Sequence, residues 1–294
     1  NRWDDATVSD WSDWPVEMGA PWEDNNGDGT YDPAVDQPYL PLDQTLYSVY
    51  NDSTDNHGVY QNEINGVEVH QTIFGGVSSA HSDLSRTFFI KYEIINKGTI
   101  VWHNPRFGPW SDVDLGDNNN DAVGVDVDSN MVYCYSAEAG AETDVFGFSP
   151  AVGFRYISSL NNLDDNLSSA GCIGNDCTGG SGGNYDDPAG QGPNYNRMLG
   201  LQNDGNEIVD PVTGEISFFT TTGDPVSSTG WLDTNVGEKQ MFFSVASSQE
   251  LIEPGDTVGF VMAVIIAQGT DNLNSITELR HASFEAKTLW YSNF

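Results

Sequence analysis

Short apolar segments, in which β-branched and aromatic residues alternate with polar ones or run together, recur along most of the chain. Such segments predict strands, and we expect them at 46–50, 67–74, 87–96, 123–127, 131–135, 151–157, 215–222, 240–246 and 257–268. Turns that contain Gly, Asn or Asp separate them. A series of about ten strands predicts an all-β fold, a β-sandwich with Greek-key or jelly-roll-like connections.

The end of the chain has a helical pattern. Ser275 followed by Glu278 is a capping box, in which each side chain satisfies a backbone N–H at the start of a helix. The pattern predicts a short C-terminal helix at 275–291. Its apolar face, which would dock on the sandwich, carries Ile276, Leu279, Ala282, Ala286 and Leu289.

Two stretches do not fit the strand pattern. Residues 1–43 are rich in Trp, Pro and Asp, and we expect an irregular arm that packs on its own domain or reaches a neighbouring subunit. Residues 158–200 are rich in Gly, Ser and Asn, and we expect a long loop insertion that carries a binding surface or contributes little to the fold. The rest of 44–294, with the insertion and the helix, is predicted to be a single domain.

The charge balance excludes two classes of partner. The chain of 294 residues has 44 acidic and 10 basic residues, a formal net charge of −34. We therefore expect no binding to nucleic acid or to anionic membrane surfaces, both of which require basic patches. No apolar run is long enough for a membrane-spanning helix, so membrane insertion is not expected. The start at Asn1 without a signal peptide suggests a processed product.

The first acidic cluster resembles a calcium-binding loop. The segment from Asp24 to Asp32 has oxygen-bearing side chains at loop positions 1, 3, 5 and 9 and Gly29 at position 6, where such loops turn sharply. The last position falls on Val35, and Asp36 comes one residue late. The alternative is a turn that binds nothing. The predicted calcium ligands are Asp24, Asn26, Asp28, Thr30, Asp32 and Asp36.

A second acidic cluster lies at 110–128. This segment has six Asp and no Lys or Arg, and its acids are interleaved with residues of the buried type. A hard divalent cation would relieve the repulsion among the carboxylates, whereas the alternative is a solvated acidic loop. The predicted calcium ligands here are Asp112, Asp114, Asp117, Asp121 and Asp126.

The three cysteines predict one disulfide. Cys172 and Cys177 lie close together between glycines that would let the loop close, and a bond there fits an oxidising compartment. Cys134 lies in a strand pattern and is expected to face the core. A zinc site is not expected, because no second pair of ligands accompanies the two close cysteines.

No catalytic motif is present, and we expect no enzyme. A glycoside hydrolase remains an alternative, because a chain rich in Asp always offers carboxylate pairs. A glycan-binding module is the stronger alternative, because exposed aromatic rings stack on sugars. The candidates for stacking are Trp102, Trp110, Tyr195 and Trp231, unless these rings belong to the core.

Several segments together resemble a group of large secreted proteins from bacteria of the Bacteroidota and Ignavibacteria type. The segments are GDPVSSTGWLD (223–233), EPGDTVGFVMAVIIAQGTDNLNSITELR (253–280), PWEDNNGDGTYDP (21–33), IKYEIINKG (90–98) and the acidic segment at 110–128. Members of this group often carry a type IX secretion sorting tail. The resemblance implies an extracellular or cell-surface location and supplies no reaction.

These observations together predict a structural role. We expect a non-enzymatic extracellular protein, a calcium-stabilised β-sandwich that forms a subunit of a cell-surface or filamentous assembly. Calcium would offset part of the repulsion within the acidic chain. The expected partners are further copies of the chain or other cell-surface proteins, and in the alternative a polysaccharide.

Overall fold

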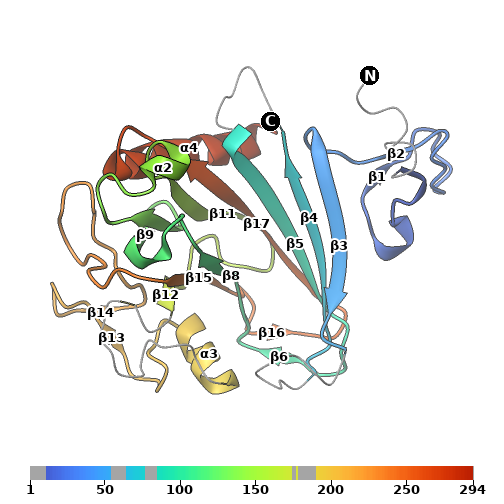
Figure 1. The fold of residues 1–294 in the computed structure, drawn as a ribbon. Coiled ribbons are helices and arrows are strands. Elements are labelled where there is room, and N and C mark those ends of the chain that lie inside the picture. Colours follow the sequence, from blue (N-terminus) through green and yellow to red (C-terminus); the bar gives the residue numbers. More distant parts are fainter. Residues whose placement is uncertain (1–10, 54–63, 77–84, 174–176, 178–189, 294) are drawn as a thin grey trace.

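The fold is a β-sandwich of two antiparallel sheets, with one long helix packed on the outer face of the larger sheet (Figure 1). The computed structural model describes residues 11–53, 64–76, 85–173, 177 and 190–293. This two-sheet architecture confirms the predicted all-β sandwich.

The larger sheet consists of two β-meanders that meet at a central strand. One meander is β3–β4–β5, the other is β9–β10–β11, and β17 lies antiparallel between β5 and β11. The strands are β3 (Gln44–Asn51), β4 (Val67–Gly75), β5 (Thr87–Asn96), β9 (Asp121–Asp126), β10 (Met131–Ser136), β11 (Ala151–Asn161) and β17 (Thr257–Ala267).

The smaller sheet has an edge strand that is broken in the middle. Its strands are β12 (Ser169–Ile173), β15 (Lys239–Ala246), β7 (Arg106–Phe107) and β8 (Trp110–Val113). β7 and β8 pair in succession with β15, on the side away from β12, and Gly108 and Pro109 separate them. A Cβ atom at Gly108 would overlap the carbonyl oxygen of Phe243, so only glycine allows this close approach. Proline is tolerated next to it because an edge strand has backbone positions that need no N–H donor.

The remaining elements are short, apart from the last helix. Three further strand pairs are β1 (Trp22–Glu23) with β2 (Gln37–Pro38), β13 (Ile208–Val209) with β14 (Ile216–Ser217), and β16 (Leu251–Ile252) with β6 (Trp102–His103). The helices are α2 (Thr143–Phe146), α3 (Gln191–Met198) and α4 (Asn272–Ser292), with 3-10 turns η1 (Val16–Met18) and η4 (Asn118–Asn120).

Both faces of the larger sheet are buried over its central strands. One face packs against the smaller sheet, and the other packs against α4. For this reason β17 is a continuous apolar run, since successive side chains enter the two cores in turn. Val258, Phe260 and Met262 enter the core between the sheets, whereas Val261 and Ala263 enter the core under α4.

The helix docks as predicted but begins earlier. Its predicted apolar face is buried against the sheet, and this face comprises Ile276, Leu279, Ala282, Ala286 and Leu289. The N-cap is Asp271, whose side chain accepts a hydrogen bond from the Asn274 N–H at 2.7 Å. Ser275 is buried inside the first turn, and its hydroxyl donates to the carbonyl of Ser149. The predicted capping box at Ser275 is therefore wrong.

Two further sequence predictions need correction. The predicted insertion at 158–200 is not one loop: it contains the end of β11, all of β12 and α3. The predicted strand at 215–222 is reduced to the two residues of β14. In both cases the outcome depends on pairing with distant strands, because β12 finds β15 as a partner and most of 215–222 finds none of comparable length.

The N-terminal arm lies beside the edge strand β3 of its own chain (Figure 1). The Tyr47 hydroxyl donates a hydrogen bond to the Met18 carbonyl at 2.9 Å, and the rings of Trp14 and Tyr47 lie 6.3 Å apart. Burial raises the pKa of Tyr47 to about 12, so its hydroxyl stays protonated and able to donate. The described part of the arm thus packs on its own domain, as one of the two alternatives predicted.

Candidate functional site

The calcium-type loop of the arm is held in a tight turn by backbone N–H groups. Both carboxylate oxygens of Asp24 accept such bonds, one from Gly27 at 2.6 Å and the other from Gly29 at 2.9 Å. These bonds, led by the one from Gly29, hold the pKa of Asp24 below its ordinary value. Gly27 and Gly29 both have positive φ angles, 75° and 74°, which glycine adopts without strain.

The buried side chain of Asp36 closes the same loop. Asp36 is 2 % exposed, and its carboxylate accepts the N–H of Asn25 at 2.9 Å and the N–H of Asp32 at 2.8 Å. The two bonds join the beginning of the loop to its end. Asp36 therefore braces the loop through the backbone, whereas the sequence pattern had predicted it as a calcium ligand.

The other oxygen-bearing side chains of the loop are of chemical types that bind hard cations. Asp28 and Asn26 accept backbone N–H groups two residues further on, and both side chains are exposed. Within the described part of the chain, no three His, Cys, Asp or Glu side chains form a group that could hold a metal ion. A cation at this loop would therefore also need amide and backbone carbonyl oxygens, which calcium accepts readily.

The second predicted calcium cluster is spread over a wide region. Asp121 and Asp126 lie at opposite ends of β9, about 16 Å apart at ~3.3 Å per residue. One cation therefore cannot contact both of them. Asp126 lies 3.7 Å from the Arg280 guanidinium of α4. Asp117 caps η4 by accepting the Asn119 N–H, whereas Asp112 and Asp114 are exposed.

Asp121 differs from these residues because it is fully buried. One carboxylate oxygen accepts the Leu115 N–H at 3.1 Å, and the other has no hydrogen-bond partner among the described residues. Burial, together with the nearby charges of Asp114 and Glu142, raises the pKa of Asp121 to about 7, although Lys239 acts in the opposite direction. The carboxyl group is therefore poised to change its charge near neutral pH.

A buried ion pair that the sequence pattern did not reveal lies close to Asp121. Lys239 and Asp233 have fully buried side chains, with Nζ and Oδ2 3.1 Å apart. The same Asp233 oxygen accepts the Val123 N–H at 3.0 Å, so the pair joins the 233–239 segment to the outer edge of β9. The only signal in the sequence is one Lys at the start of an apolar strand in an acidic chain.

The four aromatic candidates for glycan stacking fall into two groups. Trp102 and Trp231 are 9 % and 3 % exposed and belong to the core between the sheets, so their prediction as stacking residues is wrong. Trp110 and Tyr195 are 57 % and 37 % exposed. Tyr195 donates from its hydroxyl to the Asn104 carbonyl at 2.8 Å, which fixes α3 beside β7.

Trp110 lines a groove between the two sheets. The groove has a volume of about 410 Å³ and lies between the inner face of β3–β5 and the broken edge strand β7–β8. Tyr50 and Tyr92 line the wall formed by the larger sheet, and Phe107 lines the opposite wall. Three aromatic residues that were not singled out in the sequence thus join Trp110 at one site.

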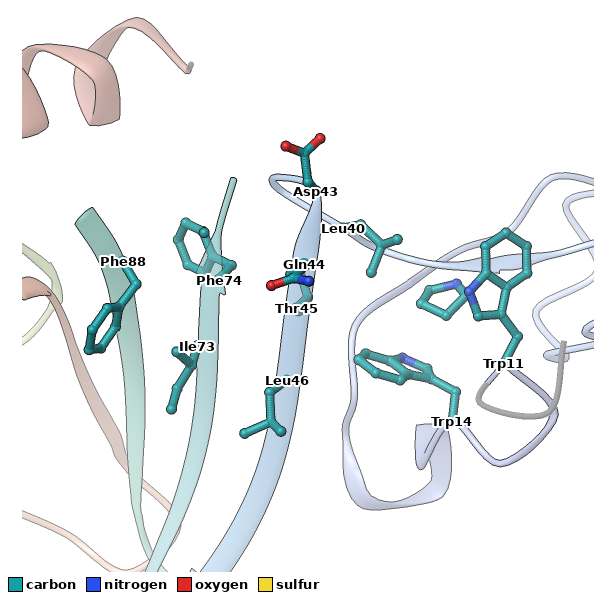
Figure 2. A pocket seen from close by; sticks show the side chains of 12 residues that line it. Trp11, Trp14, Leu40, Asp43, Gln44, Thr45, Leu46, Ile73, Phe74 and Phe88 are labelled. Carbon is teal, nitrogen blue, oxygen red and sulfur yellow. The ribbon is translucent and has the colours of Figure 1, made fainter. Parts of the chain in front are cut away.

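A second groove runs between the arm and the edge of the larger sheet (Figure 2). It has a volume of about 490 Å³, and Trp11, Trp14 and Leu40 form its wall on the arm. Leu46 on β3 and Phe88 on β5 line the side of the sheet and are 57 % and 37 % exposed. This groove borders the edge of β3, which pairs only with β4 among the described strands.

The one described histidine that contacts two polar side chains lies under the arm. The two ring nitrogens of His70 share hydrogen bonds with the Tyr47 hydroxyl at 2.8 Å and the Glu68 carboxylate at 3.0 Å. A Cβ atom at Gly19 of the arm would lie 2.9 Å from this ring, so the arm covers it closely. We interpret the row Glu68–His70–Tyr47 as an anchor for the arm.

The predicted disulfide is present. Cys172 in β12 is bonded to Cys177, and both residues are buried. Arg197 of α3 donates to the Cys172 carbonyl at 2.8 Å and lies over the Phe242 ring, so α3 is fixed to the outer face of the smaller sheet. Cys134 is free and buried in β10, as predicted, and burial raises the pKa of its thiol.

No protein-family model matches the chain, and a search of curated proteins finds no significant match.

Proposed function

We propose that the protein is a non-enzymatic extracellular structural protein whose arm binds calcium and whose sandwich is a subunit of a cell-surface assembly. The observation that carries the proposal is the Asp24–Asp36 loop. Its backbone N–H groups orient Asp24, and its remaining oxygens are of the type that calcium prefers. Asp24 and Asp28, together with the Asn26 amide oxygen and backbone carbonyl oxygens of the loop, would hold the ion, which would neutralise charge and cross-link the loop.

The position of the loop supports a link between calcium binding and assembly. The loop belongs to the arm, and the arm forms one wall of the groove along β3 (Figure 2). An ordered arm would present this groove, with the exposed Leu46, to a second copy of the chain. The backbone edge of β3 could then accept a strand from that copy, a common mode of protein association.

Two further observations are compatible with an extracellular location. A disulfide bond such as Cys172–Cys177 persists mainly in oxidising compartments. In the described residues, no helix has the length and apolar character required to cross a membrane.

The test combines thermal unfolding with light scattering after size-exclusion chromatography, in calcium and in EGTA at matched ionic strength. We expect calcium to raise the Tm, because an ion bound only by the folded state stabilises that state, and to produce assemblies larger than one chain. Asp28→Asn should remove most of the calcium effect. Asp210→Asn is the control, because Asp210 accepts backbone N–H groups in a similar turn outside the arm.

The outcomes separate the two parts of the proposal. If calcium changes neither the Tm nor the size of the protein, the calcium loop and the calcium-dependent assembly are both refuted. If the Tm rises but the protein stays monomeric at high concentration, the structural ion stands and the assembly role fails.

A further inference from the structure

The unequal width of the two sheets leaves part of the larger sheet uncovered. The larger sheet has seven strands, whereas the smaller sheet, in which Figure 1 labels β8, β12 and β15, is narrower and has its edge at β7–β8. The inner faces of β3, β4 and β5 therefore form one wall of the 410 Å³ groove, and the edge strand forms the other. The floor is apolar and closed, because Ile94 and Phe260 are 8 % and 2 % exposed.

Aromatic rings are concentrated in this groove at different depths. Trp110 and Tyr50 are half-exposed, at 57 % and 48 %, while Tyr92 and Phe107 are partly buried. Large exposed aromatic side chains that gather in one concave place indicate a ligand or partner surface. Their flat faces suit the C–H faces of pyranose rings, which are apolar and rigid.

Two of the residues that line this groove, Tyr92 and Arg106, bring hydrogen-bonding groups to it. Ser48 donates to the Gln71 side-chain oxygen at 3.2 Å, and Gln71 donates to the Tyr92 hydroxyl at 3.0 Å. The Tyr92 oxygen accepts the bond from Gln71, and its hydroxyl keeps one proton that it can donate. Arg106 donates through Nη1 to the Asn104 side chain, whereas its buried Nε–H has no partner within the described ranges.

The charge of the molecule selects among saccharides. A net charge of −34 repels polyanionic chains over the whole surface, and Arg106 is the single cationic residue among those that line the groove. A neutral glycan avoids this repulsion and still offers hydroxyl groups to Tyr92 and Arg106.

We propose that this groove binds a neutral polysaccharide, with pyranose rings against Trp110 and Tyr50 and sugar hydroxyls bonded to Tyr92 and Arg106. The site gives the protein a polysaccharide-binding activity that does not depend on the calcium loop or on self-assembly. It lies on the sandwich itself, on residues other than those of the arm.

Affinity electrophoresis in gels that contain one polysaccharide each provides the test. The probes are hydroxyethylcellulose, laminarin and galactomannan as neutral chains, and alginate as an anionic chain. We expect at least one neutral chain to retard the protein and alginate to leave it unretarded. Trp110→Ala should weaken binding about ten-fold, since one aromatic contact contributes about that factor. Tyr291→Ala is the matched control, because Tyr291 is an aromatic residue on α4 that is at least as exposed as Trp110, at 65 %.

A second variant tests the polar part of the site. Tyr92→Phe keeps the ring and removes the hydroxyl, so we expect binding to fall several-fold while the Tm changes little. Absence of retardation by all three neutral chains would overturn the proposal. Equal retardation of the Trp110 and Tyr291 variants would also overturn it, as would retardation by alginate alone. The proposal would fail too if no glycan bound but the protein bound peptides from a library and Trp110→Ala abolished that binding.

Discussion

At the scale of single residues, Asp121 makes the stability of the folded protein depend on pH. Its pKa is about 7 in the folded protein, whereas an unfolded chain has an Asp pKa of about 4. Between these values the folded state binds more protons, so stability falls as the pH rises through this window. In EGTA, we expect the wild type to lose about 1–3 kcal/mol of unfolding free energy between pH 5 and pH 8 through this group.

Asp121→Asn isolates this effect, because the amide oxygen can still accept the Leu115 N–H without carrying a charge. We expect the variant to be more stable than the wild type at pH 8 and similar to it at pH 5, measured by urea unfolding. Asp128→Asn is the control, because Asp128 is an exposed acid beyond the other end of β9 and is not among the charges that shift the pKa of Asp121. Parallel pH profiles for the wild type and Asp121→Asn would contradict the prediction.

Single residues were the hardest features to predict from sequence. Trp102, Trp110 and Trp231 have similar neighbourhoods in the chain, yet two are core residues and one is half-exposed. The difference arises because Trp110 lies on an edge strand and Trp231 packs between the sheets, which depends on tertiary pairing. The disulfide and the buried thiol were predictable because chain separation and strand pattern determine them locally.

At the scale of secondary-structure elements, one N-cap side chain determines where α4 begins. Asp271 accepts the Asn274 N–H, and an acid at this position also interacts favourably with the positive end of the helix dipole. We expect Asp271→Ala to lower the unfolding free energy by about 1 kcal/mol. The predicted capping partner Glu278 is exposed, so Glu278→Ala should change it by less than about 0.5 kcal/mol in chemical denaturation. A larger loss from Glu278→Ala would restore the capping box.

Elements with strong local patterns were predictable, and those that depend on a partner were not. β5 was predicted with its observed bounds, and β4, β10 and β17 within one residue, because β-branched and aromatic residues recur along these strands, either alternating with polar residues or in a run. β12 was missed because small residues such as Ala170 and Gly171 have weak strand preference. They form a strand only because β15 pairs with them and Gly171 lies against Thr220 without room for a Cβ atom.

The whole molecule carries its excess acid on a folded β-sandwich. The net charge of −34 was evident from composition. Its distribution was not, because the few cations occupy specific positions: Lys239 is buried with Asp233, and Arg280 lies between Asp126 and Asp224. Most other acids face solvent, so mutual repulsion opposes the compact state.

Screening of this repulsion predicts that salt stabilises the protein. Raising NaCl from 20 mM to 300 mM shortens the Debye length from about 20 Å to about 6 Å, and we expect the Tm to rise by roughly 2–6 °C in EGTA. The control is Lys91→Met, which removes the surface ion pair between Lys91 and Glu93. Because such a pair contributes little and screening weakens it only slightly, we expect the Tm of this variant to rise with NaCl as the wild type does. Calorimetry in MgCl₂ and CaCl₂ at the same ionic strength then separates screening from specific binding: screening acts equally in both salts, whereas a calcium loop adds stability only in the second. A Tm that falls with NaCl would show that attractive ion pairs outweigh repulsion, despite the acidic composition.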